Sequence, residues 1–547
     1  MYVIGISSGL KHGHHDGGAA LMQDGKIIAA SEEERFTLAK HARAELPKRA
    51  VRFCLKHAGI SIEDVDYVCS PLKTYRHYAR RLKEYFEFNF GHSPKIELYD
   101  HHLCHASSTF FGSGFGEATV LCLDNSGDSA SGMILHGKGA ELRSHVRFGR
   151  HDSLGLYYGM LTQYLGFQMT NDEYKLMGLA AYGKPTYLEA FDKILRPNGP
   201  GFDFNKALDK RLRDAEIYTT DFSTRQERIF TELLEEILGP RRLPGQPIDE
   251  RIRNIAASGQ KQLEIVITQM VRQAIKLTGC PDVCLAGGVA LNCKANMEVY
   301  REPLVRRLYV PPVPHDAGVA LGAAMLKCVE HGYPIEPMTH AFWGPEYSPE
   351  EIRKTLIQVG APFREPEDVV ESCVEDLHAD RKVGWFQGRM EFGPRALGNR
   401  SILADPRDAR AKERINATIK YREEFRPFCP SVLLEEQDAY FDDAFEAPFM
   451  VVTFPANDHA LKMIPAVIHV DHTARIQSVR RETNPLFHRL IEGFRDGAGV
   501  PVLLNTSLNI NEQPMVNGPL EALHTYFCSG LDVLYLGPFR LQKPHLE

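Results

Sequence analysis

The sequence predicts an α/β protein built from two domains, and three observations support this. First, the chain has 547 residues, more than one hydrophobic core usually holds. Second, a strand–hairpin–strand pattern occurs twice in the first 150 residues. Third, prolines and glycines accumulate between residues 334 and 368, which indicates a boundary. We therefore expect domains at residues 1–345 and 346–547.

The repeated pattern is the strongest indication of the first domain's fold. Each copy has a strand, a polar segment, a second strand, a tight turn and a third strand. The predicted strands are 3–8, 18–22 and 26–31, and then 119–123, 131–135 and 141–145. Asp24-Gly25 suits a hairpin turn because both residues tolerate a positive φ. The layout resembles the actin-like ATPase superfamily, a duplicated RNase H-like fold whose two polar turns hold nucleotide phosphates. Two unrelated β-meanders are the alternative.

The other predicted elements follow hydrophobic periodicity. Pro47 begins a helix, and residues 261–278 form an amphipathic helix that Gly279 ends. A buried strand covers 283–286. The remaining predicted elements are a strand at 307–310, helices at 317–328 and 349–359, and a strand at 502–504.

Composition excludes several classes of protein. Hydrophobic residues make up 43% and charged residues 25%, an ordinary globular mix, and the net charge is −7. This balance gives no general reason to expect binding to nucleic acid or to a membrane. The eleven cysteines contain no CxxC pair, which predicts reduced thiols and a cytoplasmic protein. We expect neither a signal peptide nor a membrane-spanning segment.

The stretch His101-His102-Leu103-Cys104-His105 predicts half of a metal site. Residues four apart on a helix are separated by about 40° around its axis, so His101 and His105 point the same way. Asp124 after a predicted strand and Asp316 before a predicted helix supply carboxylates. Two histidines and two aspartates suit iron, manganese or zinc with room for a further ligand. The alternative is a helix with two surface histidines.

A glycine pair follows the predicted strand at 283–286. Gly287 and Gly288 come directly before a short segment that ends at Asn292. A strand, a glycine pair and a helix bring backbone N–H groups close to a phosphate. A tight structural turn would have the same pattern.

The second domain differs from the first in charge. Between Arg381 and Arg426 there are 12 Lys or Arg and 6 Asp or Glu, a local excess of +6. The arginines alternate with glycines in residues 384–400, and Asn505–Asn509 follow a predicted strand. Guanidinium groups bind phosphate oxygens through two hydrogen bonds, so this pattern favours a concave site for a small polyanion. Nucleic acid is the competing partner, but it would favour a broad basic stripe with exposed aromatic residues.

An ordered set of short motifs resembles the NodU/CmcH-type O-carbamoyltransferases, which act on secondary metabolites and Nod factors. The set covers nearly the whole chain, and each motif alone is weak. The matching segments are residues 15–17, 32–36 with 40–41, 101–105, 175–179, 285–292, 315–318, 388–400, 420–430, 464–477 and 505–509. The His-rich residues 11–14 before His15 depart from the family pattern.

This resemblance implies an actin-like N-terminal domain and a YrdC-like C-terminal domain. It implies that the C-terminal site forms carbamoyl adenylate from ATP and carbamoyl phosphate. The carbamoyl group then passes to a hydroxyl of an acceptor at the N-terminal site. The bottom-up chemistry agrees, because an alcohol needs a base near neutral pH and the transfer builds negative charge.

The resemblance also assigns roles to residues. His15 is the candidate general base. The metal ligands are His101, His105, Asp124 and Asp316. The nucleotide or phosphate contacts are Lys40, Asp124, Asp128, Gly287, Gly288, Asn292, Arg395, Lys420, Arg426, Arg475, Asn505 and Ser507.

The implied cofactors are ATP with Mg²⁺ and a divalent metal, with Fe²⁺ favoured over Mn²⁺ or Zn²⁺. The implied partners are carbamoyl phosphate and a hydroxylated small molecule such as a sugar, an aminoglycoside, a macrolide or an alkaloid, as in antibiotic biosynthesis. We expect no nucleic-acid or membrane partner. The oligomeric state stays open, with a homodimer as one option. Acceptor contacts are expected in residues 200–255.

Three other functions compete with this one. A hydrogenase-maturation carbamoyltransferase would need an acylphosphatase-like start, CxxC zinc motifs and the YrdC-like part first, and the sequence has none of these. Carbamoylation of a protein or tRNA target is a second option, and the acidic net charge argues against tRNA. A non-catalytic actin-like nucleotide-binding scaffold is the third, and the arginine-rich segment makes it less favoured.

Overall fold

The computed structural model describes residues 1–9, 15–204, 210 and 231–543. The His-rich residues 11–14 and much of the expected acceptor segment lie outside the described residues. Contacts divide the chain into two compact units. Unit 1 comprises Met1–Ser70, Ala79–Glu97 and Asp316–Glu547, and unit 2 comprises Pro71–Tyr78 and Leu98–His315.

The first sheet of unit 1 contains the predicted N-terminal strands. Its strands are β1 (Tyr2–Ile6), β2 (Gly18–Gln23), β3 (Lys26–Glu32), β4 (Tyr67–Ser70) and β5 (Lys95–Leu98), in the order β3-β2-β1-β4-β5. β1 pairs antiparallel with β2 and parallel with β4. Asp24 and Gly25 have φ of 49° and 86°, as the predicted hairpin turn requires.

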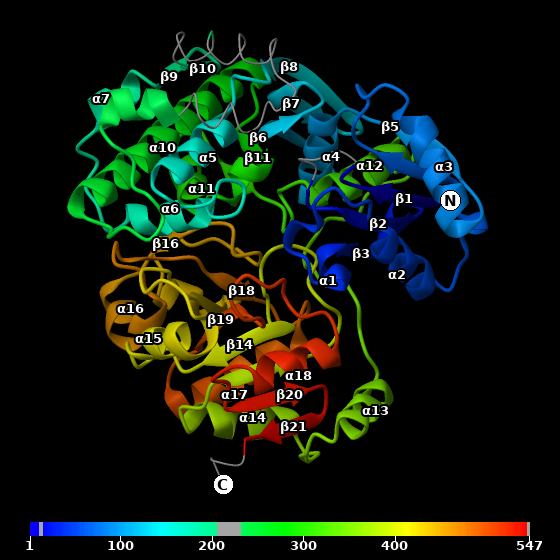
Figure 1. Cartoon of the computed structure of the whole chain (residues 1–547), viewed down its shortest axis with the longest axis vertical. Helices are drawn as coiled ribbons and strands as arrows, with labels where there is room; N and C mark the ends of the chain where they lie inside the picture. The colour runs from blue at the N-terminus through cyan, green and yellow to red at the C-terminus, as the bar shows by residue number, and fades with distance from the viewer. Residues whose placement is uncertain (10–14, 205–209, 211–230, 544–547) are drawn as a thin grey trace. The chain divides into compact units, whose positions relative to one another are not determined.

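Four helices accompany this sheet (Figure 1). They are α1 (Glu34–Thr37), α2 (Lys48–Ala58), α3 (Tyr78–Phe90) and α12 (Ala317–Glu330). α12 packs against β1, β2 and β4, and α2 packs against β2 and β3. The sheet is therefore covered by helices that come from both ends of the first predicted domain.

The sheet of unit 2 repeats the topology of the first. Its strands are β6 (Glu117–Gly127), β7 (Ala130–Lys138), β8 (Glu141–Gly149), β11 (Asp282–Ala286) and β12 (Arg307–Tyr309), in the order β12-β11-β6-β7-β8. Three antiparallel strands are again followed by strands that run parallel to the first of them. The duplicated topology confirms the predicted actin-like fold.

The polar segment that we predicted between the strands at 119–123 and 131–135 is wrong in detail. β6 continues to Gly127, and its pairing with β7 shifts in register between Leu123 and Gly127. Such an irregularity lets a strand continue while it turns some side chains away from the ladder. Asp124 therefore lies within β6 but outside its regular pairing with β7.

Six helices within the described residues of unit 2 accompany this sheet. They are α4 (His101–Ser113), α5 (Leu154–Tyr164), α6 (Glu173–Ala180), α7 (Leu188–Asp192), α10 (Glu250–Thr278) and α11 (Cys293–Tyr300). Of these, α4, α5 and α10 pack directly on its strands. A two-stranded ladder joins β9 (Leu195–Asn198) and β10 (Gly201–Phe204). α10 has 29 residues and begins earlier than predicted, because Asp249 caps it by accepting a hydrogen bond from the Ile252 N–H.

The second sheet of unit 1 is mixed and has seven strands. They are β13 (Val383–Phe386), β14 (Arg400–Ala404), β15 (Cys429–Leu433), β18 (Gln477–Val479), β19 (Val502–Ser507), β20 (Val533–Leu536) and β21 (Phe539–Gln542), in the order β18-β15-β19-β14-β13-β20-β21. β19 is longer than predicted, because Asn505, Thr506 and Ser507 pair with β14 rather than forming a loop.

Six helices from the described part of the chain accompany this seven-stranded sheet. They are α13 (Pro349–Val359), α14 (Val369–His378), α15 (Ala411–Ile415), α16 (Asp458–Met463), α17 (Pro485–Ala498) and α18 (Pro519–Phe527), and a small ladder joins β16 (Phe454–Pro455) and β17 (Thr473–Ala474). Of the six helices, α14, α17 and α18 pack on the strands of the seven-stranded sheet. Short turns of helix are η1 (Lys40–Ala42), η2 (Ile62–Asp64), η3 (Gly288–Leu291), η4 (Asn416–Lys420), η5 (Leu434–Ala439) and η6 (Pro465–Val467). Within the described residues, no helix combines the length and the apolar character needed to cross a membrane.

We predict that Gly5→Ala destabilises the protein by about 1–3 kcal/mol or more, because the added methyl overpacks the contact between β1 and α12. A Cβ on Gly5 would lie 1.7 Å from the Ala320 carbonyl oxygen. Gly116→Ala is the control, since no atom lies within 4 Å of its Cβ position. Urea unfolding of both variants measures the free energies, and equal values would contradict the prediction.

Candidate functional site

The two predicted metal-ligating histidines lie on one face of α4. Asp100 caps this helix by accepting hydrogen bonds from the N–H groups of His102 and Leu103. His101 is 3% exposed and His105 is fully buried. Their Nε2 atoms lie 3.1 Å apart, and the His101 Nε2 lies 3.4 Å from Asp124 Oδ2. The predicted helix is confirmed, and the surface-histidine alternative is wrong.

Asp124 and the glycine pair meet because β6 and β11 run parallel. Leu285 pairs with Leu121 and Ala286 with Cys122, so the end of β11 lies beside the part of β6 that leads into Asp124. The Gly288 N–H donates a 3.0 Å hydrogen bond to Asp124 Oδ1. Gly287 has φ of 87°, and a Cβ there would lie 2.2 Å from the Leu123 carbonyl oxygen. Glycine is therefore required at this edge.

Asp316 is the fourth member of the predicted ligand set. It is bonded to His315, the last residue of unit 2. One ligand atom from each of His101, His105, Asp124 and Asp316 lies within 4.8 Å of the others. Two imidazole nitrogens and two carboxylate oxygens at this spacing fit a divalent first-row metal.

Asp128 holds the start of α4, the helix that carries His101 and His105, through backbone contacts. The carboxylate is 1% exposed. It accepts hydrogen bonds from the N–H groups of Leu72, Lys73 and Thr74 and from the His101 N–H at 2.9 Å. These contacts give Asp128 a structural role at the start of α4.

Asn292 likewise uses its side chain within the protein. Its amide and that of Gln260 exchange hydrogen bonds of 2.9 and 3.0 Å. Its Oδ1 also accepts from the Ala295 N–H and so caps α11. The glycine pair likewise uses its backbone N–H groups within the protein, since that of Gly287 donates to the Pro314 carbonyl oxygen at 2.8 Å and that of Gly288 to Asp124 Oδ1.

The candidate base His15 belongs to a hydrogen-bonded group that sequence reasoning found only in part. His15 Nδ1 lies 2.8 Å from Asp16 Oδ2, and His41 Nδ1 lies 2.7 Å from Asp16 Oδ1. The Asp16 N–H also donates to the His41 carbonyl oxygen. One carboxylate thus orients two imidazoles. The signal for Asp16 and His41 was present, since each stands directly beside a residue with a predicted role, His15 or Lys40.

The predicted anion pocket lies along β15 and β19 in unit 1. The Lys420 Nζ donates to the Ser507 carbonyl oxygen and to Asn509 Oδ1, the latter at 2.7 Å. Asn505 lies opposite Cys429 in the ladder. The Arg475 guanidinium donates to the Cys429 Sγ at 3.0 Å. The structure therefore brings these predicted residues together.

Arg395 and Arg426 join the same region. Asn505 Nδ2 donates to the carbonyl oxygen of Ala396, the residue after Arg395. Arg426 is close enough to Lys420 for its charge to lower the pKa of that amine. Asn509 and Gln477 were not among the predicted site residues, although Asn509 stands in the polar cluster that follows Leu504.

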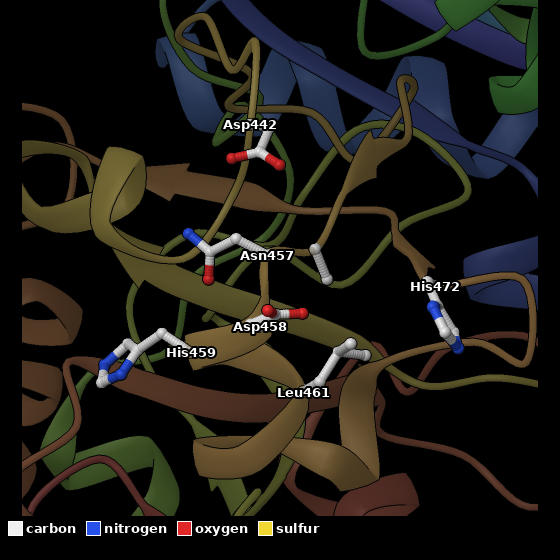
Figure 2. A pocket seen from close by; sticks show the side chains of 7 residues that line it. Asp442, Asn457, Asp458, His459, Leu461 and His472 are labelled. Atoms are coloured by element: carbon white, nitrogen blue, oxygen red, sulfur yellow. The ribbon is translucent and has the colours of Figure 1, made fainter.

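A separate open pocket of about 520 Å³ lies in unit 1. Figure 2 shows the carboxylates and imidazoles that surround it. Its lining residues are Asp442, Ala456, Asn457, Asp458, His459, Leu461 and His472. None of these is a predicted site residue, so this pocket is distinct from the groups described above.

Two protein-family models cover most of the chain. The model described as "Carbamoyltransferase N-terminus" matches residues 7–93 and 72–325, and "Carbamoyltransferase C-terminus" matches residues 374–543. The chain belongs to the carbamoyltransferase family. It is therefore an enzyme that transfers carbamoyl groups, and the non-catalytic scaffold is not supported. The predicted boundary at residues 345–346 lies between the two matches and stays a prediction.

Relatives of this carbamoyltransferase include named proteins. "Nodulation protein NolNO" of Sinorhizobium fredii is 37% identical over 99% of this chain and 83% of its own length. "3'-Hydroxymethylcephem-O-carbamoyltransferase" of Streptomyces clavuligerus is 30% identical over 63% of this chain and 60% of its own. Among solved structures, T. kodakarensis HypF is 14% identical, with a TM-score of 0.34 over 60% of this chain and 48% of its own. The sheet order, rather than that weak likeness, establishes the fold.

Burial determines the charge of Lys420 in this carbamoyltransferase. Desolvation lowers the pKa of the amine well below its ordinary value, and the charges of Arg422 and Arg426 lower it further. The amine contacts only neutral oxygen atoms among its described partners. An anion that enters the pocket would favour the protonated amine, so binding and protonation are coupled.

We predict that Lys420→Met makes protein stability less dependent on pH. In the unfolded chain the amine keeps its proton up to a pH of about 10.4. The unfolded state therefore binds more protons, and wild-type stability rises as pH increases toward that value, by at most about 1.4 kcal/mol per pH unit. Urea unfolding at pH 7 and 9.5 measures this slope, and equal slopes in both proteins would contradict the prediction.

Proposed function

We propose that this carbamoyltransferase forms carbamoyl adenylate from ATP and carbamoyl phosphate and then carbamoylates a hydroxyl group of a small molecule. In the first step, water cleaves carbamoyl phosphate to carbamate and phosphate. A carbamate oxygen then bonds to the α-phosphorus of ATP, and pyrophosphate leaves. In the second step the acceptor oxygen bonds to the carbamoyl carbon, AMP leaves and the hydroxyl proton passes to a base. The proposal assigns the two steps to two different sites.

The anion pocket suits the first step. Carbamoyl phosphate and ATP are both polyanions near neutral pH. Arginine binds phosphate oxygens through paired hydrogen bonds, and we assign this role to Arg395, Arg426 and Arg475. Lys420 and the amide and hydroxyl groups of Asn505 and Ser507 complete the pocket. The proposal keeps the YrdC-like character of the domain that provides these residues.

The His15–Asp16–His41 group suits the second step. When a carboxylate accepts the Nδ1 proton of an imidazole, the Nε2 lone pair is left as a base near neutral pH. We assign that role to His15, which would take the proton of the acceptor hydroxyl. Asp16 holds the imidazole in the required tautomer.

The four-residue group around His101 would hold a divalent metal. Such an ion supplies Lewis-acid stabilisation of the negative charge that builds up during transfer. Several first-row ions accept two nitrogen and two oxygen donors, so the donor set does not single out iron. We assign the adenylate to the neighbourhood of the Gly287-Gly288 turn, where the absence of side chains leaves room for it, with Mg²⁺ accompanying ATP. Lys40 stays a predicted contact of the nucleotide.

The single observation that carries the proposal is the burial of Lys420 with Arg426 nearby, at 3% exposure for the lysine. Buried cations with neutral oxygen contacts are costly unless an anion binds. A hydroxyl acceptor is supported by the printed name of the cephem O-carbamoyltransferase. Products of a panel of hydroxylated metabolites, identified by mass spectrometry, would name the acceptor.

We predict that two variants separate the two steps. Arg426→Ala lowers carbamoyl-phosphate-dependent pyrophosphate release by about 10²-fold or more, because a charge-stabilising donor is lost. His15→Ala keeps that release and lowers carbamoyl transfer by about 10²–10⁴-fold, because the base is lost. Chromatography of the nucleotides and of the carbamoylated acceptor measures both steps. Formation of ADP alone would contradict the adenylate, and loss of pyrophosphate release in His15→Ala would reverse the site assignment.

We also predict that His105→Ala weakens binding of a divalent metal by at least about 10–100-fold, because it removes a ligand. His136→Ala is the control, since this histidine pairs with Glu117 on another element. Equilibrium dialysis with Mn²⁺, Fe²⁺ and Zn²⁺ measures the affinity of each variant. Unchanged affinity in His105→Ala would contradict the assigned site.

A further inference from the structure

Two buried side chains from the N-terminal segment form hydrogen bonds with the same residue, Gly393, in the C-terminal half of the chain. The Gly393 N–H donates a 2.9 Å hydrogen bond to Glu32 Oε1. The Arg35 Nη2 donates a 2.9 Å hydrogen bond to the Gly393 carbonyl oxygen. Glu32 and Arg35 are 3% and 4% exposed. We call these two side chains the Glu32–Arg35 clamp.

The clamp is itself held together by charge. Arg35 Nη2 lies 3.0 Å from Glu32 Oε1, and Arg35 Nη1 lies 2.8 Å from Glu34 Oε1. Burial opposes the charge on Arg35, yet the two carboxylates outweigh burial and raise the pKa of the guanidinium overall. Removing one partner would leave a buried charge without compensation, so loss of either charge should be costly.

The clamped peptide begins the loop that carries Arg395. Gly393 has φ of 128°, a conformation that favours glycine, and Pro394 restricts the next φ. Beyond Arg395, the Ala396 carbonyl oxygen accepts a hydrogen bond from Asn505 Nδ2. Arg395 is therefore fixed from both sides, by the clamp and by β19.

A buried carboxylate shapes the rest of the same loop. Glu391 is 1% exposed, and its Oε1 accepts hydrogen bonds from the N–H groups of Leu397, Asn399 and Arg400 at 2.7, 2.9 and 3.2 Å. Glu391 thus fixes the far part of the loop, and the clamp fixes its beginning at Gly393. A change in the clamp should be transmitted to Arg395.

The other side of the clamp contacts the group around the candidate base. The Glu34 Oε2 accepts a 2.6 Å hydrogen bond from the His41 N–H. The His41 imidazole is in turn hydrogen-bonded to the Asp16 carboxylate, which is also hydrogen-bonded to the His15 imidazole. The short stretch 32–35 therefore contacts both the loop of Arg395 and the segment of the candidate base.

We propose that Glu32 and Arg35 are positioning residues for the activation step, because they hold the Gly393 peptide and so place Arg395 in the anion pocket. The inference rests on the proposed function of that pocket. It assigns a role in carbamoyl phosphate binding to residues at the opposite end of the sequence from the pocket. Neither clamp residue needs to touch a substrate.

The test compares Arg35→Lys and Glu32→Gln with wild type by pyrophosphate release at varied carbamoyl phosphate. Lysine cannot reproduce the guanidinium geometry, so Arg35→Lys should raise the KM for carbamoyl phosphate about tenfold or more, with a smaller change in kcat. Glu32→Gln keeps an oxygen acceptor for the Gly393 N–H and should have a smaller effect than Glu32→Ala. Thermal unfolding of each variant checks that it folds.

Arg389→Lys is the matched control. Arg389 also joins segments of unit 1 that are far apart in the sequence, because its guanidinium donates hydrogen bonds to the carbonyl oxygens of Ile28, Trp343 and Gly344. None of these three hydrogen bonds involves the Gly393 peptide. This variant should keep the wild-type KM for carbamoyl phosphate. An equal rise in Arg389→Lys would show that general weakening of this packing, rather than the clamp, is responsible, and would overturn the proposal.

A double-mutant cycle with Arg395→Ala gives the decisive result. If the clamp acts through Arg395, Arg35→Lys should change the KM less than twofold in the Arg395→Ala background, because coupled residues are not additive. If the KM changes of Arg35→Lys and Arg395→Ala are additive, or if Arg35→Lys has a normal KM, the positioning role of the clamp is overturned while the pocket assignment stands. Full pyrophosphate release in Arg395→Ala would instead show that the pocket assignment fails, and the clamp proposal would fail with it.

Discussion

Parallel pairing of β6 with β11 determines the geometry of the metal-ligating group. Because the last residue of β11 pairs with Cys122, Asp124 reaches the Gly287-Gly288 turn and also contacts the His101 imidazole of α4. The register shift in β6 allows this without ending the strand. Asp128 then fixes the start of α4 through backbone N–H groups. A change at any of these contacts would move several candidate ligands together.

Electrostatics organise the C-terminal pocket in a different way. Lys420 is buried against neutral oxygen atoms, and the arginines around it add positive charge. Such a site is poorly satisfied by protein groups alone and is well matched to a polyanion. In the His101 group, by contrast, carboxylates stand beside imidazoles. The two groups therefore suit opposite charges, which is the physical basis for assigning them separate steps.

The N-terminal stretch 32–41 joins the loop of Arg395 to the His15–Asp16–His41 group through hydrogen bonds. Its acidic residues do not form a solvated surface, because Glu32 and Glu34 are paired with Arg35. They hold the Gly393 peptide on one side and the His41 backbone on the other. A family motif that resembles a charged surface helix in sequence thus serves as a buried connection between two parts of unit 1.

The sequence by itself determined the features that depend on neighbours along the chain. Helix periodicity paired His101 with His105, and turn chemistry located the Asp24-Gly25 hairpin. The repeated strand pattern indicated the duplicated sheet, and alternating arginine and glycine indicated an anion site. Only the tertiary structure decided which distant groups meet. The contacts of Glu32 with Gly393 and of Lys420 with Ser507 join residues 361 and 87 positions apart. Local periodicity carries no information about such pairs, because sheet order and burial bring them together.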